Sequence, residues 1–188
     1  MAAATLASAS LMLILTASSL AAQSPAPRPP RPPQTYPAFL QAQYASLKRN
    51  IIGSADKMPA EHFPFKPAPE VMTYAGLLGH IIDVQYGFCN AVKGGANPAA
   101  GKTLDTLTDK AALVLAVKDA FAYCDDAFAA LTSENALEML TLGTAPNQRQ
   151  VARANQLTMV IAHGNEHYGN LVTYMRIHGI VPPLSTPQ

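Results

Sequence analysis

The sequence is poor in charge of either sign. Its 188 residues hold 13 Lys and Arg against 12 Asp and Glu, and charged side chains make up only 13% of the chain. This balance provides no basic field to gather phosphates and no acidic field to collect cations, so we expect no nucleic-acid partner. The length suffices for one domain with its own core and is short for two. We therefore expect one domain with one site.

Sequence patterns of several other classes are also missing. No run of about four to eight residues alternates apolar and polar side chains in a β-rich composition. The chain shows no repeat of roughly 20 to 50 residues, no glycine-rich phosphate loop and no serine nucleophile elbow. Hydrophobic residues still amount to 49% of the chain, so the core is expected to come from helices.

The first 22 residues have no charged side chain, contain the apolar run Leu11–Leu15 and end in the small residues that signal peptidase prefers. We predict a signal peptide at 1–22, cut after Ala21 or Ala22, and hence an exported protein, periplasmic or secreted. An uncleaved anchor is the alternative. The strongly apolar part is shorter than the ~20 residues that cross a bilayer, so we expect no stable membrane insertion after cleavage.

Residues 23–35 are rich in proline, which favours extended geometry, and we predict a linker there. Helical spacing of apolar residues begins at Tyr36 and continues to about Lys57. The proline-interrupted stretch from Met58 to Pro69 cannot continue a helix and must be a loop. The folded domain is therefore expected to start at residue 36.

Three further segments have the helical spacing of apolar residues, and their bounds are Thr73 to Gly94, Thr108 to about Leu131, and roughly Arg149 to Ile177. The polar stretch 132–148 is expected to be a loop. Each of the four helices has one apolar stripe to bury. We therefore predict an all-α fold, an antiparallel four-helix bundle over residues 36–183, followed by a short tail at 184–188.

The last helix carries His163 and His167, which are four residues apart and therefore on one face. Their stripe continues through Val160 and Leu171, so both imidazoles point to the bundle interior. His80, in the middle of the second helix, would be a costly polar ring without a partner. Three protein ligands plus water are the usual open arrangement for zinc. We predict a site for one divalent transition metal (Zn²⁺ first, with Ni²⁺, Fe²⁺ and Mn²⁺ open); purely structural histidines are the alternative.

Two carboxylates lie near these histidines in the sequence. Asp83 is a candidate acceptor that orients a ligand, or a solvated surface residue. Glu166 is a candidate catalytic base, or a charged residue at the rim. The order His163-x-x-Glu166-His167 also matches a zinc-protease motif. That class needs a further acidic ligand well downstream, and none of the 21 residues after His167 is acidic, so we do not expect such a protease.

Four other residues are assigned outside the site. Cys89 and Cys124 are the two cysteines, and either a disulfide or two buried thiols fits an exported helical protein. His62 is expected in the loop after the first helix. His178 is expected at a helix C-terminus, where a cation is favoured.

Three stretches of the sequence resemble the DinB-like family of YfiT-related proteins, and the first two contain the metal-site histidines. The stretches are Leu77-Leu78-Gly79-His80, His163-x-x-x-His167-x-Gly169-Asn170-Leu171 and Tyr174-x-Arg176-x-x-Gly179-x-x-Pro182-Pro183. The resemblance spans roughly residues 36 to 183. It implies a four-helix bundle with a divalent metal on His80, His163 and His167, in proteins that are often dimeric. That superfamily includes thiol-dependent transferases and metal-dependent hydrolases. An exported member is not expected to use a cytoplasmic thiol cosubstrate.

Two functions stay open at this point. As an enzyme, the protein would use the metal as a Lewis acid or to activate water against a small substrate. As a non-catalytic binding or structural module, it would use the metal to tie two helices together and gain folding energy. An open coordination position favours the enzyme, and a fourth protein ligand favours the module. The substrate is not identified by the sequence.

Overall fold

The computed structural model describes residues 34–185, so the predicted signal peptide and nearly all of the predicted linker lie outside the described residues. The main helices and strands are α1 (Tyr36–Lys57), α2 (Tyr74–Lys93), α3 (Lys110–Ala129), β1 (Met139–Leu142), β2 (Arg149–Ala152) and α4 (Arg153–Ile177). Three short 3-10 turns are η1 (Ala60–His62), η2 (Leu104–Thr106) and η3 (Pro183–Ser185). No helix within this part of the chain is both long and apolar enough to cross a membrane.

Local sequence signals explain where the first three helices begin. The side chains of Thr35, Thr73 and Asp109 each accept a hydrogen bond from a backbone N–H in the first turn of α1, α2 and α3. Gly94 ends α2 with a positive φ of 76°, a conformation that favours glycine. The predicted starts and the predicted stop at Gly94 are confirmed.

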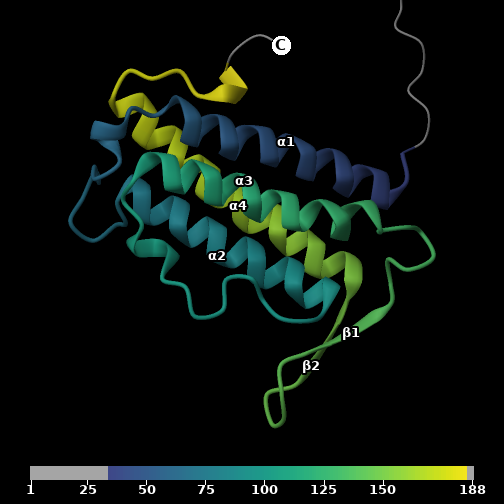
Figure 1. Cartoon of the computed structure of the whole chain (residues 1–188). Helices are drawn as coiled ribbons and strands as arrows, with labels where there is room; N and C mark the ends of the chain where they lie inside the picture. The colour runs from purple at the N-terminus through teal and green to yellow at the C-terminus, as the bar shows by residue number, and fades with distance from the viewer. Residues whose placement is uncertain (1–33, 186–188) are drawn as a thin grey trace, which may run out of the picture. The chain divides into compact units, whose positions relative to one another are not determined.

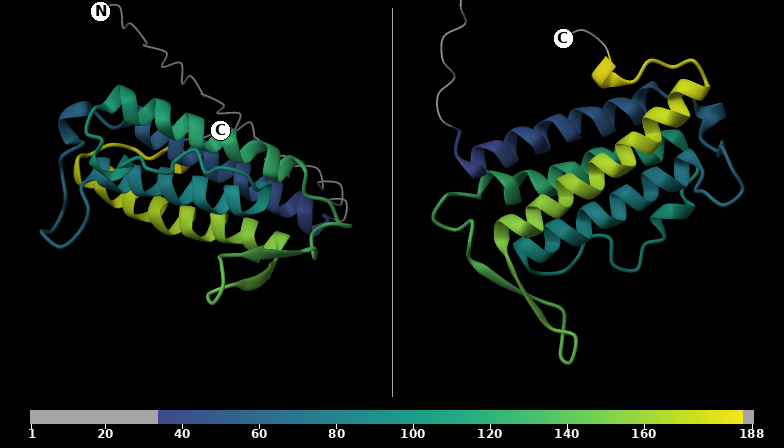
Figure 2. Two further views of the ribbon diagram at one scale, coloured as in Figure 1. Left: turned by 60° about the horizontal axis from the view of Figure 1, so that its bottom comes forward. Right: turned by 180° about the vertical axis from the view of Figure 1, so that it is seen from behind.

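The four helices pack around one core, and each contacts two neighbours closely: α1 and α2 both lie against α3 and α4 (Figure 1). Seen from behind, α4 lies between α1 and α2 (Figure 2). Leu47, Ile51, Leu78, Val117 and Leu157 are among the fully buried side chains. The predicted four-helix bundle is confirmed.

Two of the four helix contacts are parallel. The starts of α1 and α4 meet where the hydroxyl oxygens of Tyr36 and Thr158 lie 2.9 Å apart. The later halves of α2 and α3 meet at the Cys89–Cys124 disulfide, whose Cα atoms are 5.4 Å apart. The disulfide is thus the arrangement that the structure adopts, rather than two free thiols.

The other two contacts are antiparallel. The Gln41 side chain, early in α1, donates to the carbonyl oxygen of Phe128 near the end of α3 at 2.9 Å. Arg153, the first residue of α4, donates to the carbonyl oxygen of Val92 near the end of α2 at 3.3 Å. The expected antiparallel arrangement therefore holds across two faces of the bundle only. The connection 94–109 allows this, because it runs back along the bundle before α3 begins (Figure 1).

A β-hairpin between α3 and α4 corrects two sequence predictions. β1 and β2 pair antiparallel, with Met139 opposite Ala152 and Leu142 opposite Arg149, so the stretch 132–148 is not simply a loop and the fold is not purely α. Helix four starts at Arg153 and not at Arg149. Each strand is four residues long, with two exposed and two partly buried residues. Neither strand has a fully buried face, so their sequence lacks the strict alternation that such a face would require.

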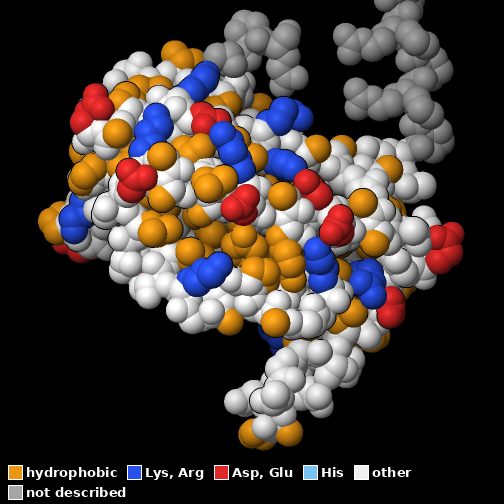
Figure 3. Space-filling model, viewed as in Figure 1, with side chains coloured by type: hydrophobic (Ala, Val, Ile, Leu, Met, Phe, Trp, Pro, Cys, Tyr) orange, Lys and Arg blue, Asp and Glu red, His pale blue; other side chains and the backbone are white. Residues whose placement is uncertain are grey.

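Both signs of charge are interspersed over the face of the molecule in Figure 3. The ion pairs Lys48–Asp125, Lys93–Asp126 and Lys118–Asp56 bridge neighbouring helices. The figure shows no field of a single sign on this face, as the composition predicts.

Candidate metal centre

The three predicted histidines come together between α2 and α4. His80 Nε2 lies 3.2 Å from His163 Nε2, and His167 Nε2 lies 2.9 Å from His163 Nε2. Within residues 34–185, these three residues form the group whose potential ligand atoms all lie within 4.8 Å of one another. His167 is buried, and His80 and His163 are half-buried. The convergence that the sequence predicted is therefore present.

Hydrogen bonds among the rings account poorly for this cluster. One nitrogen of a neutral imidazole is either a donor or an acceptor. His163 Nε2 can therefore form a good hydrogen bond with only one of its two neighbours. Two imidazole nitrogens bound to one tetrahedral ion at about 2.0–2.1 Å would lie about 3.3 Å apart. The donor set, with three imidazole nitrogens within 4.8 Å of one another, thus fits a divalent transition metal.

The electrostatics keep two of the rings neutral. Burial, followed by the neighbouring rings of His167 and His80, lowers the pKa of His163 from 6.5 to about 4. Burial and His80 also lower the pKa of His167. Glu166 opposes both shifts. At neutral pH, His163 and His167 are therefore unprotonated and offer the lone pairs that a metal ion requires.

Two glycines beside the histidines let neighbouring elements approach closely. A Cβ on Gly79 would clash with the backbone of Leu104 and Asp105 in η2, and a Cβ on Gly164 would lie 2.5 Å from a methyl carbon of the buried Leu47. Gly79 precedes His80, and Gly164 follows His163. The glycines therefore let η2 and α1 fix the two helices at the level of the site.

The two nearby carboxylates are outside the ligand group. Asp83 is exposed and, among the described residues, makes no hydrogen bond to the three histidines, so a ligand-orienting role has no support. Glu166 is exposed and acts on His163 and His167 through its charge. Its role as a base stays a prediction.

Asn170 is a neighbour of the site that the sequence analysis missed. Its side-chain Nδ2 lies 3.4 Å from Nδ1 of His167. The O and N atoms of an amide exchange places by a flip, so with Oδ1 in this position the amide would accept from Nδ1–H and leave Nε2 free for the metal. The signal was the spacing of three residues on one helix.

The other two histidines lie outside the site, as expected. Their rings stack on each other, with His62 and His178 centroids 3.8 Å apart, and Phe65 packs edge-on against His178. His62 belongs to η1, and His178 caps the C-terminus of α4. They form a separate aromatic cluster near the loop that precedes α2.

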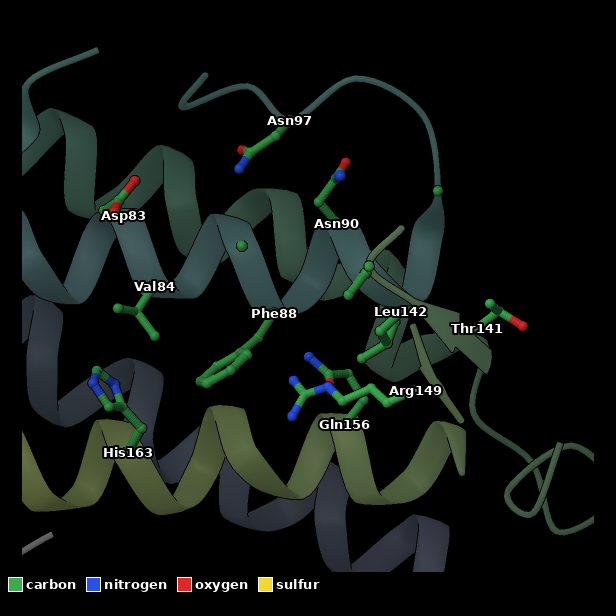
Figure 4. Close-up of a pocket in the computed structure, with 14 residues that line it drawn as sticks. Asp83, Val84, Phe88, Asn90, Asn97, Thr141, Leu142, Arg149, Gln156 and His163 are labelled. Carbon is green, nitrogen blue, oxygen red and sulfur yellow. The ribbon is translucent and has the colours of Figure 1, made fainter. Parts of the chain in front are cut away.

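A cavity of about 690 Å³ opens beside His163. Figure 4 shows it between α2 and α4, with Phe88 in the middle and with Leu142 and Arg149 of the hairpin at the far end. Gln156 of α4 also lines it. A small molecule could therefore reach the histidines along this cavity. These lining residues could not be recognised from the sequence, because the hairpin that closes the cavity has no clear sequence signal.

Fold and site together define a helical-bundle protein in which three histidines could hold a metal ion. Comparison with known proteins agrees, since residues 38–186 match the DinB family. The chain belongs to this family. It is 31% identical over 136 residues to the uncharacterized protein YjoA of Bacillus subtilis strain 168, covering 70% of this chain and 84% of YjoA.

Two solved structures share the fold. The crystal structure of the DinB-like protein YjoA from Bacillus subtilis superposes with a TM-score of 0.62 and 24% identity, over 80% of this chain and 99% of that chain. A DinB-like protein from Bacillus cereus ATCC 10987 gives the same TM-score at 18% identity, over 80% and 97% of the two chains. At these identities, the likeness supports the fold alone.

Proposed function

We propose that this DinB-family protein is an exported metalloenzyme that holds one divalent transition metal, Zn²⁺ first among them, through His80, His163 and His167. It would act as a hydrolase or transferase on a small substrate. The observation that carries the proposal is the convergence of three Nε2 atoms, together with an open cavity that one of the three residues, His163, lines. Bound there, a divalent metal supplies Lewis acidity, which polarises a substrate oxygen or lowers the pKa of a water molecule.

The residues of the chain have distinct tasks in this proposal. His80 brings α2 to the site, and His163 and His167 bring α4. His163 also lines the cavity, so a substrate there would meet the ligand cluster on that side. Glu166, whose charge reaches two of the rings, is the candidate base for moving a proton during the reaction.

A purely structural metal is the second candidate. It would tie α2 to α4 and add folding energy. However, no fourth His, Cys, Asp or Glu within residues 34–185 joins the group. Three protein ligands leave a coordination position for substrate or water, which favours the enzyme.

Export is supported by two features. The segment 1–22 has the pattern of a signal peptide, and the Cys89–Cys124 disulfide is of a kind that persists in oxidising compartments. The proposal therefore places the mature protein in the periplasm or outside the cell, with no stable membrane insertion. It also includes a homodimer, which size-exclusion chromatography with light scattering would test.

Elemental analysis of the purified mature protein without a polyhistidine tag, after incubation with metal, tests the site. We expect about one equivalent of a transition metal in the natural protein and none in His80→Ala. Equal metal content in both proteins would refute the three-histidine site. An open coordination position would then be tested by X-ray absorption spectroscopy of the loaded protein, where a fourth protein ligand would favour the structural role.

A further inference from the structure

The cavity beside His163 continues away from the histidines. A second cavity of about 400 Å³ shares Phe88, Arg149 and Gln156 with the first. Both lie along α4 and the hairpin. These three shared residues therefore mark a region next to, but separate from, the proposed metal ligands. In Figure 4, Phe88 lies in the middle of the first cavity, and Arg149 and Gln156 lie at its far end from His163.

Gln156 is a buried amide without a protein partner. Its side chain is only 4% exposed, and it makes no hydrogen bond to any described residue. Among the described residues, Gln85 and His178 each have a side-chain nitrogen that has no partner and no access to solvent. Gln156 is not one of them, so its unpartnered amide atoms keep some access to solvent. The amide of Gln156 therefore opens on the cavities that it lines. A buried amide is costly unless it has a partner, and a ligand in the cavity would supply one.

Among residues 34–185, Arg149 is the only Lys or Arg that lines either cavity. Within the described part of the chain its guanidinium forms no ion pair. Arg153 differs, because it binds the Glu138 carboxylate at 2.7 Å and also the carbonyl oxygen of Val92. The acidic lining residue, Asp83, lies toward the His163 end in Figure 4. The far end of the cavity is therefore positive and can receive an anion.

The start of α4 reinforces this polarity. The helix begins at Arg153 after Ala152, which provides no side-chain cap, and the backbone N–H groups of Arg153 and Ala154 donate to the carbonyl oxygens of Glu138 and Ala136. The N-terminal end of a helix carries a partial positive charge and favours anions. Gln156 lies in the first turns of this helix, and Arg149 lies in β2 immediately before it.

We propose that Arg149 and Gln156 bind the carboxylate of an organic substrate whose apolar part lies against Phe88. A single guanidinium beside an amide suits a singly charged carboxylate, with its two acceptor oxygens. A phosphate dianion would call for more than one cation. The inference rests on the proposed function in one respect, because the substrate is assumed to react at the metal held by the three histidines. Binding of the carboxylate by Arg149 and Gln156 itself requires no metal.

Helix geometry fixes the length of such a substrate. Gln156 and His163 are seven residues apart on one face of α4, which corresponds to about 10 Å along the axis. Val84 and Phe88 provide apolar surface between these ends, and Leu142 adds to it at the far end. The substrate class is thus a molecule with a carboxylate about 10 Å from its reacting group and an apolar segment between them, the size of a short peptide or an N-acyl amino acid.

The first test uses 3-phenylpropionate and the metal-free full-length mature protein. The side-chain amide resonances of Gln156, assigned by their loss in Gln156→Leu, should shift on titration. Arg149→Met should weaken binding at least fivefold. Arg49→Met, which removes an exposed Arg on α1 that lines neither cavity, should not. Absence of a shift, equal affinity in Arg149→Met, or tighter binding of inorganic phosphate would each overturn the proposal.

A second test measures the length with metal-loaded protein and linear hydroxamates that end in either a carboxylate or a methyl group. At the chain length that spans about 10 Å, the carboxylate should improve affinity about tenfold, and Arg149→Met should abolish that gain only. If the carboxylate improves affinity at no chain length, the proposed carboxylate anchor, Arg149 with Gln156, is overturned. If neither series binds while 3-phenylpropionate still shifts Gln156, the anchor stands and the metal proposal fails.

Discussion

His80 Nε2 lies 3.2 Å from His163 Nε2, across 83 residues of sequence. The contact joins α2 to α4 in the middle of both helices, and His167 completes the cluster on the same face of α4. A metal ion held by this cluster would crosslink two antiparallel helices. Metal binding and folding stability should therefore be coupled.

Thermal unfolding should show this coupling. Metal at 100 times its dissociation constant should stabilise the natural protein by about 2.7 kcal/mol. His163→Ala and His167→Ala should each lose both the stabilisation and the bound metal, because only two of the three imidazole ligands remain in each variant. His62→Ala is the matched control, since His62 stacks on His178 away from the site, and it should keep both. Full metal retention in the His163→Ala, His167→Ala double variant would end the metal-site hypothesis.

The metal-free protein should become less stable as the pH falls from 6.5 to about 4. The pKa of His163 is about 4 in the folded state and 6.5 ordinarily, so the unfolded chain binds more protons across this window. Urea unfolding of the natural protein and of His163→Gln at several pH values measures the difference. The midpoint of the variant should depend less on pH in this range, and an identical dependence would contradict the lowered pKa.

Metal binding should persist below the ordinary pKa of histidine for the same reason. A metal ion competes with protons for the imidazole lone pairs, and His163 takes up a proton only near pH 4. Titration of the loaded protein with acid should release metal mainly below about pH 5. Release centred at the ordinary value of 6.5 would show that the rings are not held neutral in the fold.

The Glu166→Gln variant should show whether Glu166 acts only as a charge at the rim of the site or binds the metal as a ligand. Glu166 is exposed and outside the histidine group, so the metal stoichiometry should stay at one. The affinity should fall only roughly two- to fivefold, as for a surface charge, and the difference should shrink at high salt. A loss of stoichiometric binding, measured by calorimetry, would make Glu166 a ligand instead.

Reduction of the Cys89–Cys124 disulfide should destabilise the bundle without emptying the site. The cysteines are 35 residues apart, a loop for which a crosslink contributes about 3–4 kcal/mol. Urea unfolding with and without reductant measures the change, and the double Cys→Ser variant should be insensitive to reductant. Metal stoichiometry is the control, because the disulfide links α2 to α3 and not to α4.

The sequence predicted those parts of the molecule that depend on local spacing. Apolar residues at helical intervals located the four helices, and the interval of four between His163 and His167 placed both rings on one face. His80 added the third ligand because a lone ring there needed a partner. These features do not depend on how the helices pack against one another, so the sequence alone could predict them.

Features that depend on non-local packing were missed. The parallel pairing of α2 with α3 has no local signal except the 16 residues from 94 to 109, which are enough to run back along the bundle. The sequence predicts helix four from roughly Arg149, and three of the residues 149–152, namely Arg, Gln and Ala, do suit a helix. They form a strand because they pair with β1. The role of Gln156 could not be recognised, because it depends on the cavity that the hairpin helps to form.

The β-hairpin is a replaceable part of this protein. None of its strand residues is buried, whereas the three histidines and most of the core belong to the helices. Insertions or deletions in the hairpin could therefore deepen, narrow or recharge the far end of the cavity while the bundle stays intact. Substitutions within residues 139–152 could therefore change the substrate preference in evolution while the metal centre stays unchanged.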